Sequence, residues 1–231
     1  MKLHPALRLL IPALILAGLL LMPRRVVPAG SGDGDPSPLV ALEEDVPEVP
    51  LEELFHEMAG PDARITVVEF SDFGCQYCGK FHRETLPGIR RDYVDTGKVR
   101  WRMVPFVLGM FPNGVEAMRA ATCVAEQGED RFWAMHDTLF AQQDTWKATR
   151  YADQLFKSYA VIAGAEAEAF TQCYDDVRSS DLVTAANALA NKTGVRSTPT
   201  FFVNGQLIQG ALPDRDFRQI LEAALSGVAR R

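Results

Sequence analysis

The sequence predicts an α/β fold in which a small β-sheet is interrupted by a long block of helices. Two observations support this class. Short β-branched and apolar runs, which are typical of strands, lie on both sides of residues 113–194. Residues 113–194 themselves show helical patterns that are bounded by glycines. The chain is therefore expected to run β-α-β, then through the helices, and then β-β-α.

The composition limits the class of protein. Of the 231 residues, 47% are hydrophobic and 23% are charged, which excludes disordered, collagen-like and coiled-coil chains. The length fits one large domain, or one domain with an insertion. The 24 Lys and Arg residues against 30 Asp and Glu residues give a net charge of −6. Since the sequence has no basic cluster, we expect no nucleic-acid partner.

The first 29 residues resemble an export or anchoring signal. The uncharged apolar run Leu9–Met22 suits a signal peptide, and it is shorter than the roughly 20 residues of a membrane-spanning helix. Cleavage of residues 1–29 and their retention as a membrane anchor are both open, and a buried helix is a weaker alternative. Residues 30–50 are rich in Gly, Pro and acidic residues and are expected to be a flexible linker. The folded domain is then expected at residues 51–226, in the periplasm or on the outer face of the cytoplasmic membrane.

The first elements of this domain follow a strand-helix-strand order. Ile65–Phe70 is a mostly apolar, β-branched run, as expected of a strand that is buried on both faces. Gly74 ends that run, and the helical pattern from Cys75 to about Thr96 is expected to be kinked before Pro87. Val99–Val107 is the second expected strand.

The remaining elements are a set of helices, a hairpin and a closing helix. Five helices are expected in the inserted block, at Val115–Gln127, Asp130–Gln143, Thr149–Ala163, Ala165–Asp176 and Ser179–Thr193. Asn204-Gly205 lies between two short apolar runs and is typical of a type I′ turn, which predicts a hairpin of strands 200–203 and 206–209. Asp214–Leu225 is expected to form an amphipathic helix.

The chemistry is expected at the pair Cys75 and Cys78. A helix that begins at Cys75 directs free backbone N–H groups and the positive end of its dipole at this sulfur, which stabilises a thiolate. The thiolate is the nucleophile of disulfide exchange, and Cys78 lies on the same helical face, where it can close a disulfide with Cys75. The pair is therefore expected to be redox-active and catalytic. A structural disulfide is one alternative; half of a zinc site is disfavoured because Cys123 and Cys173 are 50 residues apart, and no metal is expected.

Glu69 interrupts the first expected strand six residues before Cys75. An unpaired carboxylate is costly to bury, so burial would raise its pKa. With a raised pKa, Glu69 would exchange protons with Cys78 as the disulfide opens and closes. In the alternative, Glu69 faces a partner or solvent at the end of the strand.

Thr198-Pro199 comes directly before the hairpin. A cis bond there would turn the backbone sharply, and Thr198 would then face the cysteines and pair with a bound peptide as an added strand. The frequency of cis X-Pro bonds alone gives this form a share of about 5%. Together with Gln76 and Tyr77, which separate the two cysteines, Thr198 and Pro199 form the expected substrate-binding set.

Cys123 and Cys173 fall in two of the inserted helices. An even number of cysteines in an exported protein favours a second, structural disulfide, which would stabilise the domain by roughly 4 kcal/mol. Two buried free thiols are the alternative. His82, one helical turn after Cys78, is expected to be solvated, and His136 is expected to lie in the core.

These motifs together resemble a known family. The run Val68-Glu69-Phe70-Ser71-Asp72-Phe73, followed by Cys75-x-x-Cys78-x-x-Phe81 and later by Thr198-Pro199-Thr200-Phe201, is similar to the pattern of a thioredoxin fold. The inserted helices make residues 50–226 resemble the DsbA-like thiol:disulfide oxidoreductases, particularly their membrane-tethered envelope branch. The resemblance implies a thioredoxin fold with an inserted all-helical subdomain.

The same resemblance implies roles for the site residues. Cys75 attacks or forms the mixed disulfide, Cys78 resolves it, the Thr198-Pro199 bond is cis, and Glu69 is the buried acid. It also implies a dithiol oxidase that introduces disulfides into unfolded or reduced exported proteins. A quinone-linked membrane partner, DsbB-like or VKOR-like, would reoxidise it. No cofactor is expected besides the Cys75–Cys78 disulfide, and we expect a monomer.

Two departures from the family pattern leave other functions open. Gln76-Tyr77 lacks the His that strongly oxidising members place before the second Cys, and Thr198 also precedes the Pro in isomerase-type relatives. A reductase or isomerase that receives electrons from a membrane donor is therefore one alternative, and a dimer would be expected for it. A peptide-binding chaperone with a structural cysteine pair is another, and a metal-handling protein is a distant third.

Overall fold

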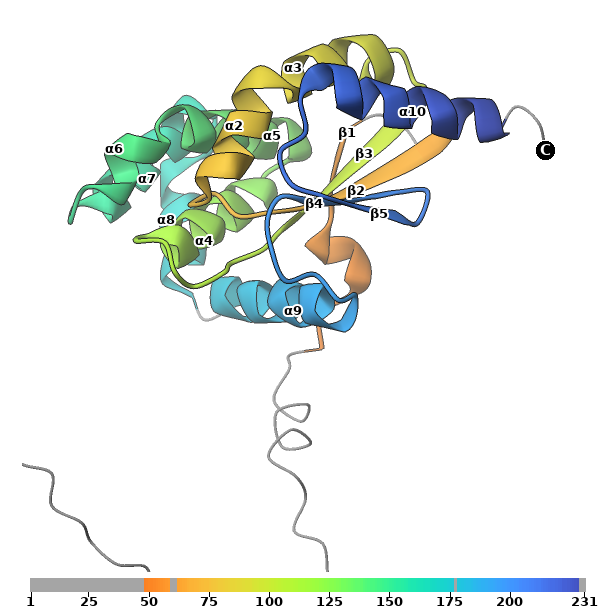
Figure 1. The fold of residues 1–231 in the computed structure, drawn as a ribbon. Coiled ribbons are helices and arrows are strands. Elements are labelled where there is room, and N and C mark those ends of the chain that lie inside the picture. Colours follow the sequence, from red (N-terminus) through yellow and green to blue (C-terminus); the bar gives the residue numbers. More distant parts are fainter. Residues whose placement is uncertain (1–47, 59–61, 177, 229–231) are drawn as a thin grey trace, which may run out of the picture. The chain divides into compact units, whose positions relative to one another are not determined.

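The computed structural model describes residues 48–58, 62–176 and 178–228 (Figure 1). The expected signal or anchor at residues 1–29 and most of the expected linker lie outside the described residues. Within the described ranges, no helix combines the length and the apolar character that crossing a membrane requires.

In the described part of the chain, five strands form one mixed sheet in the order β1-β3-β2-β4-β5. They are β1 (His56–Met58), β2 (Ile65–Ser71), β3 (Val99–Pro105), β4 (Thr200–Val203) and β5 (Gln206–Gln209). β2 and β3 run parallel, and β4 runs antiparallel to both β2 and β5. The predicted α/β class is confirmed, and the hairpin has its predicted bounds. Asn204 (φ 47°) and Gly205 (φ 85°) both have positive φ, as a type I′ turn requires.

The sequence did not predict β1, which lies at one edge of the sheet. β1 pairs antiparallel with β3, and His56 lies opposite Met103. A strand of three residues is too short to show a periodic pattern. Glu57 in its middle forms ion pairs with Arg100 and Arg102 of β3, at 2.6 and 2.7 Å. Contacts with β3 therefore account for this strand, and those contacts are not local in sequence.

Helices cover both faces of the sheet. The first half of the described chain contains the 3-10 helix η1 (Leu51–Leu54), the helices α2 (Gln76–Glu84) and α3 (Leu86–Ile89), and the π-helical segment η2 (Arg90–Val94). After β3 come α4 (Gly114–Ala125), α5 (Glu129–Ala141), α6 (Gln143–Lys147), α7 (Ala152–Ile162), α8 (Ala167–Asp175) and α9 (Arg178–Lys192), and α10 (Asp214–Val228) follows β5. Figure 1 shows α3 and α10 on one face of the sheet and α9 on the opposite face.

The inserted block contains the five predicted helices and the short helix α6, which the sequence did not predict. The helix expected from Cys75 is broken at Thr85, the residue between α2 and α3. Pro87 lies in the first turn of α3, where its missing N–H is tolerated. The predicted kink before Pro87 is therefore a complete break between two helices.

Aromatic rings hold α2 and α10 against the sheet. Phe81 of α2 packs against Trp101 of β3, Phe201 of β4 and Phe217 of α10, with ring centroids 4.7 to 6.0 Å apart. All four rings are buried. Because α2 also carries Cys78, this cluster fixes the position of the cysteine pair relative to the sheet.

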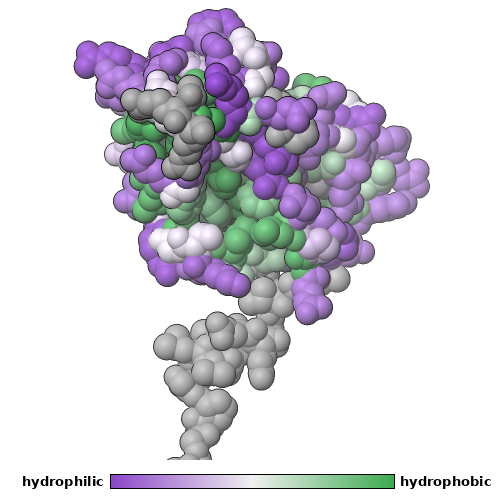
Figure 2. All heavy atoms as spheres, turned by 90° about the vertical axis from the view of Figure 1, so that its right-hand side faces the viewer, coloured by the Kyte–Doolittle hydropathy of each residue, from purple (hydrophilic) through white to green (hydrophobic). Residues whose placement is uncertain are grey.

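Apolar side chains also gather on the face that Figure 2 shows. A pocket of about 320 Å³ is lined by residues of β2, β4 and α9, including Val68, Phe70, Phe202 and Leu189. Neither Cys75 nor Cys78 belongs to this lining. The pocket therefore lies between the sheet and α9 and is not part of the site around the cysteine pair.

Candidate active site

Cys75 occupies the N-cap position of α2, directly before the helix begins at Gln76. The preceding loop is held by Asp72, whose carboxylate accepts hydrogen bonds from the N–H of Gly74 and the N–H of Leu108, each at 2.8 Å. The backbone N–H of Cys75 donates to the carbonyl oxygen of Asp72 at 3.0 Å. These bonds set Cys75 at the end of the helix where free N–H groups are available.

The surroundings of Cys75 stabilise a thiolate. Its pKa is lowered to about 5, chiefly by a hydrogen bond with the Cys78 thiol, and further by Thr198 and by the N–H groups of Cys78 and Tyr77, although burial opposes this shift. Both cysteines are free in the structure, which therefore shows the reduced pair. In this reduced form, the Cys75 sulfur is ionised at neutral pH.

Cys78 has the opposite properties. Its side chain is 0% exposed, whereas that of Cys75 is 4% exposed. Burial and the neighbouring Cys75 raise the pKa of Cys78 well above its ordinary value, and the Ser71 hydroxyl offsets part of this shift. The reduced pair thus consists of an ionised outer sulfur and a protonated inner one.

The Thr198-Pro199 bond is cis, and the carbonyl oxygen of Thr198 lies 3.5 Å from the Cys75 sulfur. Thr198 and Pro199 are both buried. On the other side of Cys75, Gln76 is exposed and Tyr77 is 56% exposed. The residues expected to bind substrate therefore reach Cys75 from two segments that lie 123 positions apart.

Glu69 is fully buried and has two hydrogen-bond partners. Its carboxylate is 2.8 Å from Nε2 of His82 and accepts a bond from Nε1 of Trp101 at 3.1 Å. Burial raises the pKa of Glu69, but the charge and hydrogen bond of His82 outweigh this effect, and the net shift is downward. The expectation of a raised pKa was therefore wrong, and the structure agrees with the alternative in which Glu69 faces a partner.

The prediction that His82 is solvated was also wrong. Its side chain is 3% exposed and stacks on Phe140, with ring centroids 4.1 Å apart. The spacing of four residues puts His82 on the same face of α2 as Cys78, and this spacing was a usable signal. His136 lies in the core as predicted, and burial lowers its pKa to about 4.

Three further residues that the sequence did not single out support the backbone around Cys75. Gln143 donates from Nε2 to the carbonyl oxygen of Cys75 at 2.9 Å, and Lys147 donates to that of Gly74 at 2.7 Å. Asp72, which holds the loop, is buried, and this burial raises its pKa to about 6. Gln143 and Lys147 come from α6, so no local pattern could have linked them to the cysteines.

Gly74 is expected to be intolerant of substitution. A Cβ atom at this position would lie 2.4 Å from Cβ of Phe111, so Gly74→Ala must displace either the phenyl side chain or the loop before Cys75. We expect a loss of about 1–3 kcal/mol in the free energy of unfolding, as for other overpacked sites. Urea unfolding would measure it. In a chain that already carries Phe111→Gly, which removes the Cβ atom that the new methyl group would meet, Gly74→Ala should cost little. An equal loss with and without the Phe111 side chain would contradict the clash.

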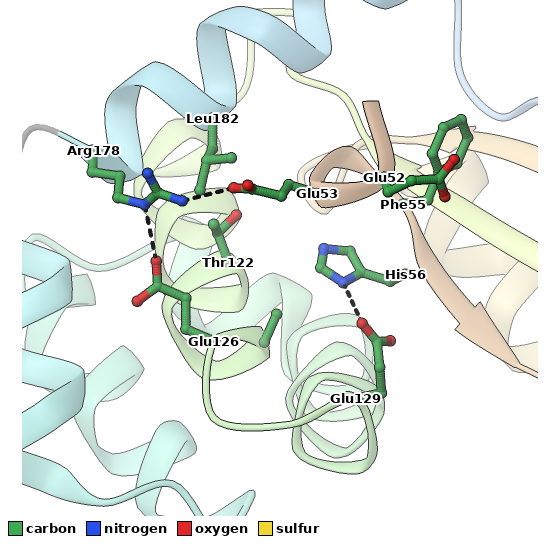
Figure 3. A pocket seen from close by; sticks show the side chains of 10 residues that line it. Glu52, Glu53, Phe55, His56, Thr122, Glu126, Glu129, Arg178 and Leu182 are labelled. Carbon is green, nitrogen blue, oxygen red and sulfur yellow. Dashed lines mark hydrogen bonds and ion pairs between the residues drawn. The ribbon is translucent and has the colours of Figure 1, made fainter. Parts of the chain in front are cut away.

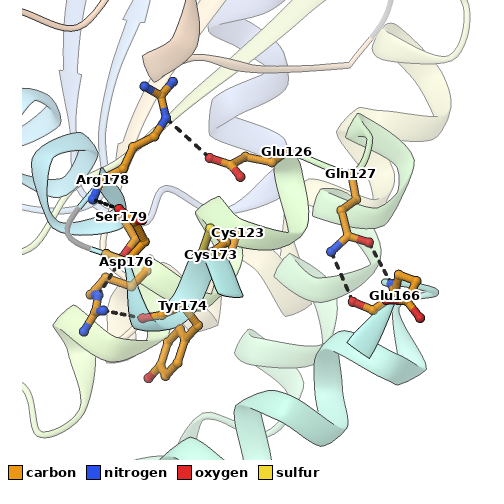
Figure 4. Close-up of a disulfide and its surroundings, with 10 residues drawn as sticks. Cys123, Glu126, Gln127, Glu166, Cys173, Tyr174, Asp176, Arg178 and Ser179 are labelled. Carbon is orange, nitrogen blue, oxygen red and sulfur yellow. Dashed lines mark hydrogen bonds and ion pairs between the residues drawn. A yellow bond between two sulfur atoms is a disulfide. The ribbon is translucent and has the colours of Figure 1, made fainter. Parts of the chain in front are cut away.

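Cys123 of α4 and Cys173 of α8 form a disulfide with Cα atoms 5.6 Å apart (Figure 4). Cys123 is fully buried. Nearby, Arg178 of α9 pairs with Glu126 at 3.7 Å, so the ends of three inserted helices meet in this region. The disulfide is therefore part of the helical block and is separate from the pair Cys75 and Cys78.

An acidic pocket of about 190 Å³ lies outside the cysteine site (Figure 3). Its lining includes Glu52, Glu53, Glu126 and Glu129. Each of these carboxylates has a basic partner, which is Arg102 for Glu52, Arg178 for Glu53 and Glu126, and His56 for Glu129. Each of these carboxylates is thus already paired with another side chain of the protein. Across residues 48–58, 62–176 and 178–228, no group of three or more His, Cys, Asp or Glu side chains is arranged to hold a metal ion.

Sequence comparisons relate the chain to one family. A family model described as Thioredoxin matches residues 57–223. Disulfide bond formation protein D of Bacillus subtilis is 29% identical over 170 residues, which are 72% of this chain and 75% of that protein. The Na(+)/H(+) antiporter NhaA 3 of Salinispora tropica is 37% identical over 165 residues, which are 70% of this chain and 24% of the antiporter. Since the chain spans about a quarter of the antiporter's length, that name assigns no transport activity to it.

Among solved structures, alpha-DsbA1 of Wolbachia pipientis has the same fold. The TM-score is 0.69 at 24% sequence identity, and the match covers 81% of this chain and 96% of the other. The predicted thioredoxin fold with inserted helices is thereby confirmed.

Proposed function

This chain belongs to the thioredoxin family and is DsbA-like, and on that premise we propose that it is a protein thiol:disulfide oxidoreductase that works as a dithiol oxidase. Its substrates would be unfolded or reduced exported proteins, into which it introduces disulfides through Cys75 and Cys78. The disulfide between these two residues is itself the redox group, so the proposed activity needs no bound cofactor.

The observation that carries this proposal is the difference between the two sulfurs. The thiolate of Cys75 is stabilised in the reduced pair, with a pKa of about 5. Stabilising the reduced pair makes the disulfide a stronger oxidant, and a sulfur of low pKa is a good leaving group. The Cys75 environment therefore favours the oxidase direction, even though the intervening Gln76-Tyr77 contains no His.

In the proposed reaction, a substrate thiolate attacks the Cys75 sulfur of the Cys75–Cys78 disulfide. A mixed disulfide forms between the substrate and Cys75, and Cys78 leaves and takes up a proton. A second substrate thiolate then attacks the substrate sulfur of the mixed disulfide, and Cys75 leaves as a thiolate. Two electrons pass from the substrate to the cysteine pair. Of the two protons from the substrate thiols, one stays on Cys78 and one goes to solvent.

We assign substrate contacts to Thr198, Pro199, Gln76 and Tyr77. An extended peptide that pairs with the backbone at Thr198 would hold its cysteine beside Cys75, since the Thr198 carbonyl is 3.5 Å from that sulfur. The exposed side chains of Gln76 and Tyr77 would border the same peptide.

We also propose an extracytoplasmic location, with the apolar run at residues 9–22 acting as an anchor or as part of a cleaved signal. A quinone-linked membrane protein, DsbB-like or VKOR-like, would then reoxidise the cysteine pair. The protein would act as a monomer. The apolar N-terminal run and the Cys123–Cys173 disulfide support this location, because disulfides persist in oxidising compartments.

The reduction potential tests the proposed direction. We expect a value of about −120 to −180 mV when the full chain is equilibrated with glutathione buffers and the cysteine pair is quantified by trapping and mass. Such a disulfide is readily transferred to other proteins. A value near −270 mV would contradict the oxidase and favour the reductase. A pair that never opens in these buffers would contradict exchange altogether.

A further inference from the structure

Proton uptake by Cys78 is the step that the site around Cys75 leaves unexplained. Cys78 is 0% exposed, and its pKa is raised. A sulfur with a raised pKa is a poor leaving group in its thiolate form. A proton must therefore reach this sulfur inside the protein as the Cys75–Cys78 bond opens. Cys75 cannot supply it, because its own sulfur is then bound to the substrate.

Glu69 is poorly suited to supply that proton. Its carboxylate is 2.8 Å from Nε2 of His82 and 3.1 Å from Nε1 of Trp101, and both contacts favour the ionised form. A carboxylate that stays ionised accepts hydrogen bonds and has no proton to give. Its position instead fixes the orientation of the His82 ring.

Ser71 connects the His82 ring to Cys78. The Ser71 hydroxyl interacts with the Cys78 sulfur, and its oxygen lies 3.5 Å from Nε2 of His82. The same hydroxyl also interacts with Glu69. Ser71 is itself fully buried. A hydroxyl both donates and accepts, so it can take a proton on one side while it gives one on the other.

The second ring nitrogen of His82 faces in a different direction from this contact. Nδ1 of His82 is buried and has no hydrogen-bond partner within the described protein. The same side chain lines a pocket of about 190 Å³, together with Arg83, Arg90 and Asp137. His82 therefore has one nitrogen at the Glu69–Ser71 contact and a side chain that borders a cavity large enough for water.

We propose that His82 carries the proton that Cys78 takes up and gives back, acting through the Ser71 hydroxyl, with Glu69 holding the imidazole in place. As the disulfide opens, Nε2 of His82 gives a proton to Ser71, and Ser71 gives its own proton to the Cys78 thiolate. His82, which carries a proton on both ring nitrogens before this step, is then neutral and keeps only the proton at Nδ1. When the pair is reoxidised, the same transfers run in reverse. This inference rests on the proposed exchange activity and adds a positioning residue to it.

Several groups that face His82 will shape the pH dependence of this step. Glu69 of β2 is in contact with the ring, and His136 of α5 packs against it with ring centroids 4.4 Å apart. Asp137 of α5 is close enough to interact electrostatically. Arg83 and Arg90 border the same pocket. The observed profile will therefore belong to this group of charges and not to an isolated histidine.

The test compares two His82 variants of the full chain in single-turnover oxidation of a peptide that contains two cysteines. His82→Gln keeps a donor for Glu69 but cannot be protonated, and we expect it to slow the opening of the disulfide by about 100-fold. We expect it also to weaken the pH dependence of the rate and to remove the solvent deuterium isotope effect. His82→Ala should be equally slow, and added imidazole should restore its rate by entering the space next to the pocket.

His56→Gln is the matched control. His56 is also a buried histidine that is paired with a glutamate, Glu129 at 3.3 Å, and it contacts neither cysteine. We expect it to keep the wild-type rate and profile. A wild-type chain that exchanges thiols while His82→Gln keeps its rate, profile and isotope effect would overturn the role of His82 and leave the proposed function intact. The role of His82 would also be limited to packing if His82→Ala were slow without rescue by imidazole while His82→Gln kept the wild-type rate. A wild-type chain without any exchange would overturn the proposed function itself.

Discussion

Replacing Cys75 with Ser is expected to slow the oxidation of a dithiol peptide by at least about 1,000-fold, because the attacked sulfur and the ionised leaving group are both lost. In the structure this sulfur has a pKa near 5 and lies at the start of α2, whereas Cys78 is inaccessible. No other free cysteine is present in the described part of the chain. Stopped-flow measurement of peptide oxidation would quantify the loss.

Cys78→Ser is the natural control for that result. This variant keeps the outer sulfur but has no partner to displace a bound substrate, so a mixed disulfide between Cys75 and an oxidised probe peptide should accumulate and be visible as an intact mass. Full exchange activity in Cys75→Ser would contradict the proposed mechanism. Two results together would instead favour the chaperone alternative. The wild type would show no exchange activity, and Cys75→Ser would still shield unfolded protein fully.

The second large effect is expected from the pair Cys123 and Cys173. Replacing both with Ala is expected to lower the free energy of unfolding by roughly 4 kcal/mol, because the unfolded chain would no longer be constrained by a loop of about 50 residues. The disulfide joins α4 to α8, so the helical block should be the region that loosens. Urea unfolding and hydrogen exchange of the oxidised proteins would show the size and the location of the loss.

This double substitution should leave the pKa of Cys75 and its contact with Cys78 unchanged. The pKa of Cys75 depends on Cys78, Thr198 and the first turn of α2, and none of these groups belongs to the disulfide. A stability loss below about 1 kcal/mol would show that the helical block does not depend on this crosslink. A shifted pKa of Cys75 would show that the inserted helices help to position Cys75 and Cys78.

Much of the fold could be predicted because its signals are local. The hairpin of β4 and β5 was predicted with its bounds, since Asn204-Gly205 is a strong turn signal between two short apolar runs. The inserted helices were predicted from their glycine boundaries. β1 was missed because three residues carry no periodicity, and its conformation depends on pairing with β3. α6 was missed because it starts only two positions after α5 ends.

The site shows the same division between local and distant signals. Cys75 and Cys78 were predicted to be the reactive pair from their spacing and from the helix that follows them, and this assignment stays a prediction. The pKa of Glu69 was predicted in the wrong direction because its partner His82 lies 13 residues away on another element. Gln143 was missed for a similar reason, since it reaches the Cys75 carbonyl from α6. Such polar pairings depend on packing, which a single sequence does not display.

The low pKa of Cys75 and its contact with Cys78 also determine how the protein reacts with oxidants. A cysteine with a low pKa is the one that peroxide attacks, and its sulfenic acid proceeds irreversibly to sulfinic and sulfonic acids if it is left alone. Here the thiol of Cys78 is hydrogen-bonded to Cys75, so a sulfenic acid on Cys75 would condense with it at once and lose water. The product is the same disulfide that the protein uses for its work. Peroxide would therefore reoxidise the reduced pair to its disulfide, whereas it would irreversibly oxidise an isolated thiol of the same low pKa.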